Sequence, residues 1–220
     1  MKHSNMVFIQ WLFFFLLFTV PQLMSAQYDD ILHPVYNKSH WKVIQNDSIA
    51  IIENTLSHRL DTVFVNSNDL NSDDHEERYI IAIVGSLLSY DFTYAMFGGA
   101  HPTAGEWYRT VNIATKQEVS LVDLFSSDVI LKVILRDTNF TKYAQNKNPE
   151  NIYDFISSLG GGCEVSFSDL LVSYAIKSVE INVVVIEFGL THGCEACPEC
   201  FTKIDIKLPK SAMRYNFIDN

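Results

Sequence analysis

The sequence predicts an α+β domain in which an antiparallel sheet packs against one main and one short helix. Two stretches, 106–113 and 201–208, alternate between two kinds of side chain with a period of two, which is typical of strands. Residues 181–186 form an almost wholly apolar run, which is typical of a central strand. The main helix is predicted by apolar residues that recur at helical spacing, namely Ile130, Leu131, Ile134 and Leu135.

The first 26 residues have the pattern of a secretory signal peptide. A weakly positive start precedes an apolar block at 6–20, and Ala26 provides the small residue for cleavage before Gln27. The block is shorter than the ~20 residues of a full membrane span, which favours cleavage over retention as an anchor. We therefore expect a secreted or periplasmic protein with no stable membrane span after cleavage.

Residues 27–77 are expected to supply N-terminal strands and an acidic loop of the same domain. The sequence predicts a hairpin in 41–52, turning at 46–48, and a further strand at 63–65. Residues 66–77 are strongly polar and acidic, so we expect a solvated loop there. A calcium site is the alternative, but the central glycine and terminal glutamate of a calcium loop are missing.

Residues 78–220 are expected to form the core of the domain. The stretch 78–96 is the longest β-like segment, and Gly85 with Ser86 predicts a bulge or bend inside it. The polar residues 115–118 predict a turn and 119–121 a short returning strand. Ser126 to Asp128 predict the start of the main helix, which we expect to run towards Tyr143. Next come a short helix at 152–159, stopped by the glycines at 160–162, and strands at 164–171, 178–188 and 201–208.

The stretch 98–125 carries a family resemblance. It begins Gly-Gly-Ala-His, continues into an aromatic strand with Asn112 near its end, and passes through a polar turn into Ser-Leu-Val-Asp-Leu-Phe before a helix. This pattern resembles the extracytoplasmic domain of RsiV-type anti-sigma factors, which sense lysozyme, and a similar domain that accompanies some peptidoglycan deacetylases. The resemblance continues more weakly through 79–209 and implies an α+β, non-catalytic envelope domain. The family's turn usually carries a glycine, whereas Thr115-Lys116-Gln117 has none.

Four cysteines are the first candidate for chemistry: Cys163, Cys194, Cys197 and Cys200. An exported chain meets oxidising conditions, so an even number of cysteines favours two disulfides, with three pairings open. A tetrahedral zinc site and a redox-active pair, with His192 as an additional ligand, are the alternatives. We predict disulfides, with no metal and no cofactor.

A tentative ligand-binding set surrounds the glycine-rich turn: Gly98, Gly99, His101, Trp107 and Tyr108. The His101 imidazole either contacts a ligand or locks the turn by hydrogen bonding to a backbone carbonyl. Trp107 and Tyr108 are neighbours on a strand and point to opposite faces, so one is expected in the core and the other at the surface. An exposed aromatic side chain there suits contact with a protein or a glycan.

Charge and motifs limit the functions that the chain performs. The net charge of −10 argues against nucleic acid and anionic membranes as partners and suits a basic protein. None of the sequence motifs of serine hydrolases or zinc proteases is present. We therefore expect a non-catalytic binding domain of the bacterial cell envelope whose partner is a lysozyme-like basic protein or a peptidoglycan fragment.

Overall fold

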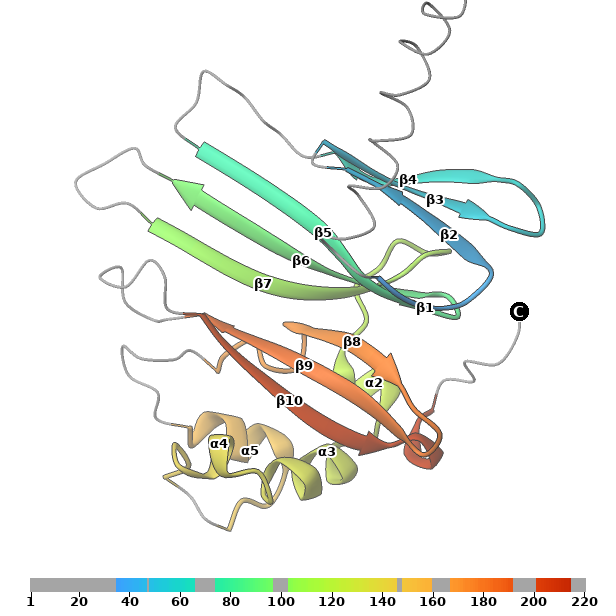
Figure 1. The fold of residues 1–220 in the computed structure, drawn as a ribbon. Coiled ribbons are helices and arrows are strands. Elements are labelled where there is room, and N and C mark those ends of the chain that lie inside the picture. The colour runs from blue at the N-terminus through green and yellow to red at the C-terminus, as the bar shows by residue number, and fades with distance from the viewer. Residues whose placement is uncertain are drawn as a thin grey trace, which may run out of the picture. The chain divides into compact units, whose positions relative to one another are not determined.

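The computed structural model describes most of the chain after its first 34 residues. The described residues are 35–46, 48–65, 74–96, 103–145, 148–159, 167–191 and 201–214. They form three sheets and a group of short helices (Figure 1), which confirms the α+β class and replaces the single expected sheet with three. Which strands pair across long loops depends on contacts that local patterns do not record, so the sequence alone did not show this division.

The central sheet has the strand order β1-β5-β6-β7. Strand β1 is parallel to β5, and the other neighbours are antiparallel. Gly85 and Ser86, expected to form a bulge or bend, are the hairpin turn between β5 and β6; the bulge lies earlier in β5, between Ile80 and Ala82. The strands are β1 (Tyr36–Lys38), β5 (Asp74–Val84), β6 (Leu87–Met96) and β7 (Thr103–Asn112).

Residues 74–77, expected in a solvated acidic loop, begin the long strand β5 instead. Their register explains the difference, because Glu76 and Glu77 pair with Tyr94 and Thr93 of β6. Cross-strand pairing therefore overrides the low strand preference of consecutive acidic residues.

The small sheet is an antiparallel meander in the order β2-β3-β4. Strands β2 (Trp41–Gln45) and β3 (Ile49–Asn54) form the predicted hairpin, and β4 (Leu60–Val65) returns beside β3. Its inner face packs on the central sheet around a compact apolar core. The fully or nearly buried members are Ala50, Ile52, Phe64, Ile80, Ile83, Leu88 and Ile113.

The third sheet, here called the C-terminal sheet, contains β8 (Tyr174–Val179), β9 (Val183–Thr191) and β10 (Phe201–Pro209) in the order β10-β9-β8. Strand β10 matches its prediction, and β9 is central as expected. The prediction of a single strand at 178–188 is wrong, because residues 180–182 form a turn between β8 and β9 and Ile181 is 90% exposed. Residues 167–171, expected in a strand, form turns.

Small polar side chains join the C-terminal sheet to the other face of the central sheet. Ser89 and Thr110 hydroxyls lie 2.9 Å apart. The Thr110 hydroxyl donates to the Tyr174 carbonyl (3.0 Å), and the Ile176 amide donates to Ser89 Oγ (2.9 Å). Because both hydroxyls are buried and satisfied, the two sheets approach closely without leaving polar groups unpaired. We call these residues the polar seam.

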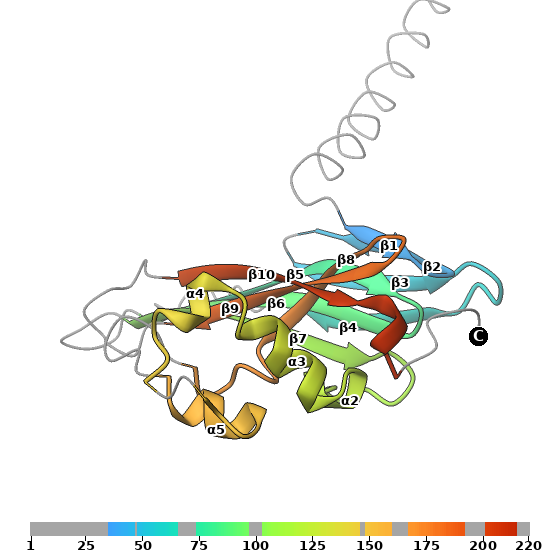
Figure 2. The ribbon, with the colours of Figure 1, turned by 90° about the horizontal axis from the view of Figure 1, so that it is seen from below.

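The helices cover the outer face of the C-terminal sheet (Figures 1 and 2). The predicted main helix begins at Ser127 but ends at Ile134, because Asp137 caps a separate short helix through its side chain. Their buried side chains and those of β8–β10 form the larger core. The helices are α2 (Leu121–Leu124), α3 (Ser127–Ile134), α4 (Thr138–Thr141) and α5 (Ile152–Ser157), and a 3-10 turn, η1 (Lys210–Ala212), follows β10.

Candidate binding site

Several residues singled out from the sequence lie outside the described residues. These are Gly98, Gly99 and His101 of the tentative ligand set, the four cysteines Cys163, Cys194, Cys197 and Cys200, and His192. Disulfides, zinc binding and redox chemistry therefore stay predictions. Among the residues that the structure does describe, no group of three or more histidine, cysteine, aspartate or glutamate side chains is arranged to hold a metal ion.

Trp107 and Tyr108 point to opposite faces of β7, as strand geometry requires. Trp107 is half-buried and stacks on two aromatic rings of β6. Its centroid lies 4.8 Å from that of Tyr94 and 5.5 Å from that of Phe92, with 11° between planes in each pair. Arg78 lies against Phe92, 4.9 Å from the ring centroid. These side chains therefore form one packed aromatic cluster on this face of the central sheet.

Tyr108 is buried between the central and C-terminal sheets, so it is the core member of the pair. Its hydroxyl donates to Glu187 Oε1 at 2.6 Å, and Lys177 donates to the same carboxylate and to Asp205. Burial raises the pKa of Tyr108, and its hydrogen bond to Glu187 adds to this. Burial opposes ionisation of Glu187, but hydrogen bonds from Lys177 and Tyr108 outweigh it and lower the pKa of that carboxyl.

A cleft lies at the end of the molecule where four turns meet, and we call it the turn cleft. It is lined by the β1–β2, β3–β4 and β5–β6 turns and by the turn after β7, and its volume is about 860 Å³. Clefts of roughly 300–1,000 Å³ are the usual size for small-molecule sites. Three of the turns connect strands of the small and central sheets, and the fourth follows β7 of the central sheet, so the two sheets fix the walls of the cleft.

Basic side chains from three of these turns line the turn cleft: Lys38, Arg59 and Lys116. Arg59 pairs with Asp61 across 3.2 Å, whereas Lys38 and Lys116 form no ion pair with any described residue. Trp41 adds an aromatic wall. An acidic chain thus presents positive charge in this cleft, which suits an anionic ligand.

The backbone around Lys116 explains how the turn forms without the glycine that the resemblance led us to look for. Lys116 adopts a left-handed conformation, with φ of 60°. Asn112 holds the turn, because its side-chain oxygen accepts from the Ala114 and Thr115 amides and its carbonyl accepts from the Lys116 amide. A lysine in the left-handed region costs free energy that a glycine would not.

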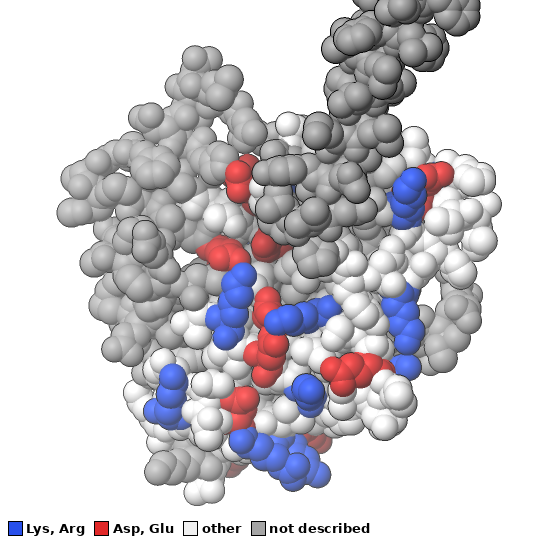
Figure 3. All heavy atoms as spheres, viewed as in Figure 1, with Lys and Arg blue, Asp and Glu red and all other residues white. Residues whose placement is uncertain are grey.

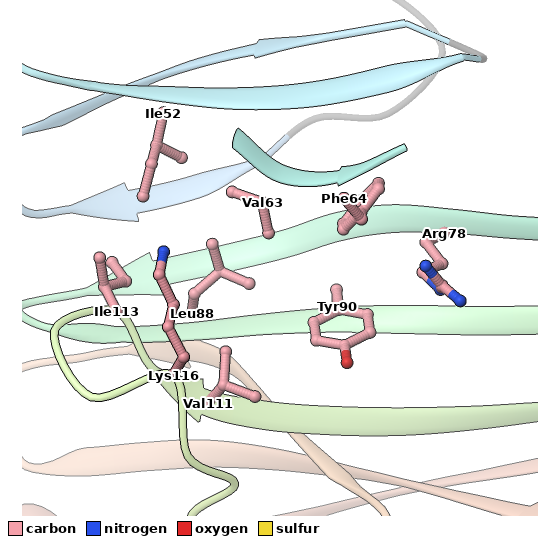
Figure 4. Close-up of a pocket in the computed structure, with 9 residues that line it drawn as sticks. All are labelled: Ile52, Val63, Phe64, Arg78, Leu88, Tyr90, Val111, Ile113 and Lys116. Carbon is pink, nitrogen blue, oxygen red and sulfur yellow. The ribbon is translucent and has the colours of Figure 1, made fainter. Parts of the chain in front are cut away.

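A second, apolar cavity adjoins the turn cleft and shares Ile113 and Lys116 with it (Figure 4). We call it the slot; its volume is about 180 Å³. Val63 and Phe64 of β4 form one wall, with Leu88, Tyr90 and Val111 of the central sheet opposite. Lys116 lies at one end of the slot and Arg78 at the other.

No linear motif marks the turn cleft or the slot, because their residues come from separate turns and strands. The one local signal was the turn at 115–117, which departs from the resembled family by lacking a glycine. On the face seen in Figure 3, basic and acidic side chains of the described residues are interspersed. Among described residues, no helix has the length and apolar character that a membrane span requires.

Comparisons with known proteins give a distant structural neighbour. No family model and no curated protein matches the chain. Among solved structures, it is similar to a DUF3298 family protein from Pseudomonas aeruginosa PAO1, whose crystal structure was determined at 2.15 Å resolution. The two share 11% sequence identity, with a TM-score of 0.33, over 67% of this chain and 64% of that chain. The match therefore spans less than two thirds of the neighbour's length.

Proposed function

We propose that the chain is a non-catalytic binding domain of the bacterial cell envelope, secreted or periplasmic, that takes an anionic peptidoglycan fragment in the turn cleft. The observation that carries this proposal is the meeting of Lys38 and Lys116 in a cleft of about 860 Å³ on a chain whose net charge is −10. The family resemblance points to the same compartment and the same class of ligand.

The chemistry of peptidoglycan fragments matches the walls of this cleft. Such fragments carry carboxylates on the peptide stem, or on the lactyl group where no stem is attached, and ammonium groups bind carboxylates through charge-assisted hydrogen bonds. Their sugar rings have apolar faces that pack on aromatic side chains, and Trp41 lines the cleft. The amides and hydroxyls of Asn37, Asn54 and Ser57 add polar contacts.

A basic protein is the other partner expected from the sequence. A continuous acidic surface would favour such a partner by electrostatic steering. The face seen in Figure 3 instead mixes both signs among the described residues. On this face, therefore, the described residues form no continuous acidic patch that would mark a site for a basic protein.

Binding of purified muropeptides to the mature chain tests the proposal. We expect saturable binding by calorimetry, with a change in tryptophan fluorescence from Trp41. Lys38→Gln removes one charge-assisted hydrogen bond, worth roughly 1.5–3 kcal/mol, and is expected to weaken binding at least ~10-fold. Lys132→Gln, an exposed lysine on α3, is the matched control. No binding at millimolar muropeptide, or equal losses in both variants, contradicts the proposal.

A further inference from the structure

Four segments around the turn cleft contain basic residues and no acidic ones. The chain as a whole has 26 acidic residues against 16 lysines and arginines, so this composition differs from the average of the sequence. The basic residues are Lys38, Arg59 and Lys116, and two histidines accompany them. We call these segments together the basic end; they are residues 37–40, 55–60, 85–86 and 114–117.

The acidic residue nearest to this charge compensates only part of it. Asp61, which also lines the turn cleft, pairs with Arg59 across 3.2 Å. Lys38 and Lys116 are exposed, and neither forms an ion pair within the part of the chain that the structure describes. The basic end therefore presents a local positive charge that an anionic partner complements.

The β3–β4 turn exposes two leucines beside these lysines. Leu56 is 72% exposed and Leu60 is 61% exposed. The turn is held in place, because the side-chain oxygen of Asn54 accepts the Leu56 and Ser57 amides, each at 3.0 Å. A single exposed leucine is normal on a protein surface. Two leucines in a fixed turn next to uncompensated lysines instead indicate a partner that offers both negative charge and an apolar environment.

We propose that the basic end binds the surface of an anionic phospholipid bilayer. Lys38 and Lys116 contact the headgroups, and Leu56 inserts between the acyl chains at the boundary of the headgroup layer. Trp41, which lines the turn cleft, lies at the level of the headgroups. Leucine, tryptophan and lysine in this combination are typical of segments that lie in a membrane interface. The inference goes beyond the proposed function, since its ligand is a lipid surface and not a soluble fragment.

The net charge of −10 does not oppose binding through this end. Net charge argues against an anionic surface for a chain whose charge is spread evenly, but exposed charges interact only over a Debye length of about 10 Å at 0.1 M salt. The groups that decide binding are therefore those at the contacting end. The four segments of the basic end carry no aspartate or glutamate, so the contact itself is attractive.

A lipid surface accounts for more of this end than an acidic protein does. The volume of the turn cleft, about 860 Å³, accommodates a phosphate-bearing headgroup between its lysines. Acyl chains provide the apolar environment that Leu56 lacks in water. An acidic protein surface would supply the negative charge alone.

The test is sedimentation of the mature chain with vesicles that contain no peptidoglycan. We expect binding to vesicles of phosphatidylglycerol and phosphatidylcholine in equal parts, and none to vesicles of phosphatidylcholine alone. Raising the salt concentration from ~0.1 M to ~1 M shortens the Debye length to about 3 Å and is expected to release the chain. Lys38→Gln and Lys116→Gln are each expected to weaken binding about 5-fold, and Lys132→Gln on α3 is their control.

Matched substitutions at two exposed apolar residues locate the inserted side chain. Leu56→Ser is expected to weaken vesicle binding ~10-fold. Ile181→Ser is the control, because Ile181 is 90% exposed in the β8–β9 turn, away from the basic end in the sequence and beside Glu180. A second measurement uses Leu56→Trp, whose fluorescence should be quenched by brominated lipid more strongly than that of the parent or of Ile181→Trp.

Other results overturn the proposal. Equal binding to neutral vesicles, binding that high salt leaves intact, or equal losses in Leu56→Ser and Ile181→Ser show that the basic end does not make the contact. No binding of the parent chain to either kind of vesicle excludes the lipid surface and leaves an acidic protein as the macromolecular partner of this end. Muropeptide binding is measured without vesicles, so the proposed function and this inference can fail independently.

Discussion

Asp91 carries a half-buried carboxyl group whose titration affects stability. It accepts the Tyr79 amide at 2.9 Å, beside the bulge in β5. Burial, together with the nearby Glu106 carboxylate, raises the pKa of Asp91 from 3.8 to about 6. The folded protein therefore holds a proton that the unfolded chain releases above about pH 4. The stabilisation that the protonated Asp91 carboxyl provides is therefore fully present below pH 4 and is lost as the pH rises through about 6.

We predict that Asp91→Asn flattens this pH dependence. A pKa raised by about 2 corresponds to at most ~3 kcal/mol, so the variant should be more stable than the parent at pH 7 by about 1–2 kcal/mol. Asparagine keeps an oxygen for the Tyr79 amide and removes the repulsion with Glu106. Urea denaturation between pH 4 and 7 measures the slope, and Asp128→Asn, exposed on α3, is the control. An unchanged slope in Asp91→Asn would show that another group titrates.

At the scale of elements, the turn after β7 places a lysine where the backbone favours glycine. The left-handed conformation of Lys116 costs ~1–2 kcal/mol, and a glycine at this position would avoid that cost. Part of the gain in stability would be lost, because glycine gives the unfolded chain more conformational freedom. Lys116→Gly is therefore expected to raise the free energy of unfolding by about 0.5 kcal/mol, measured by urea denaturation. Lys132→Gly, within α3, should lower it by about 1 kcal/mol. If both variants lose stability, the turn does not carry the inferred strain.

Elements with clear local patterns were predictable from the sequence, and the site was not. Alternation located β7 and β10, and the polar turn at 46–48 located the first hairpin. The turn at 180–182 was missed because Ile181 makes it part of an apolar run, although its side chain points into solvent. The turn cleft depends on four loops that meet only after the sheets pair, and no single window of sequence contains that information.

At the scale of the whole molecule, the polar seam lies between the central and C-terminal sheets and so separates two apolar cores. One core lies between the small and central sheets, and the other lies between the C-terminal sheet and the helices. Ser89 and Thr110 connect the sheets that separate them. Since each sheet contributes backbone or side-chain partners to the seam, opening one core exposes buried polar groups of the other.

We therefore predict that residues 35–214 unfold in a single cooperative transition. Trp41 and Trp107 report on the small and central sheets, and far-ultraviolet circular dichroism includes the helices, so the two signals should give the same midpoint. Ser89→Ala leaves the Ile176 amide without its partner and is expected to cost about 1–3 kcal/mol, lowering both midpoints together. Ser57 is exposed in the β3–β4 turn, so Ser57→Ala is the control and is expected to leave both midpoints unchanged. Separate midpoints in the parent protein would mean that the polar seam does not couple the two cores. If the midpoints coincide in the parent protein and differ only in Ser89→Ala, the Ser89 hydroxyl is the group that couples them.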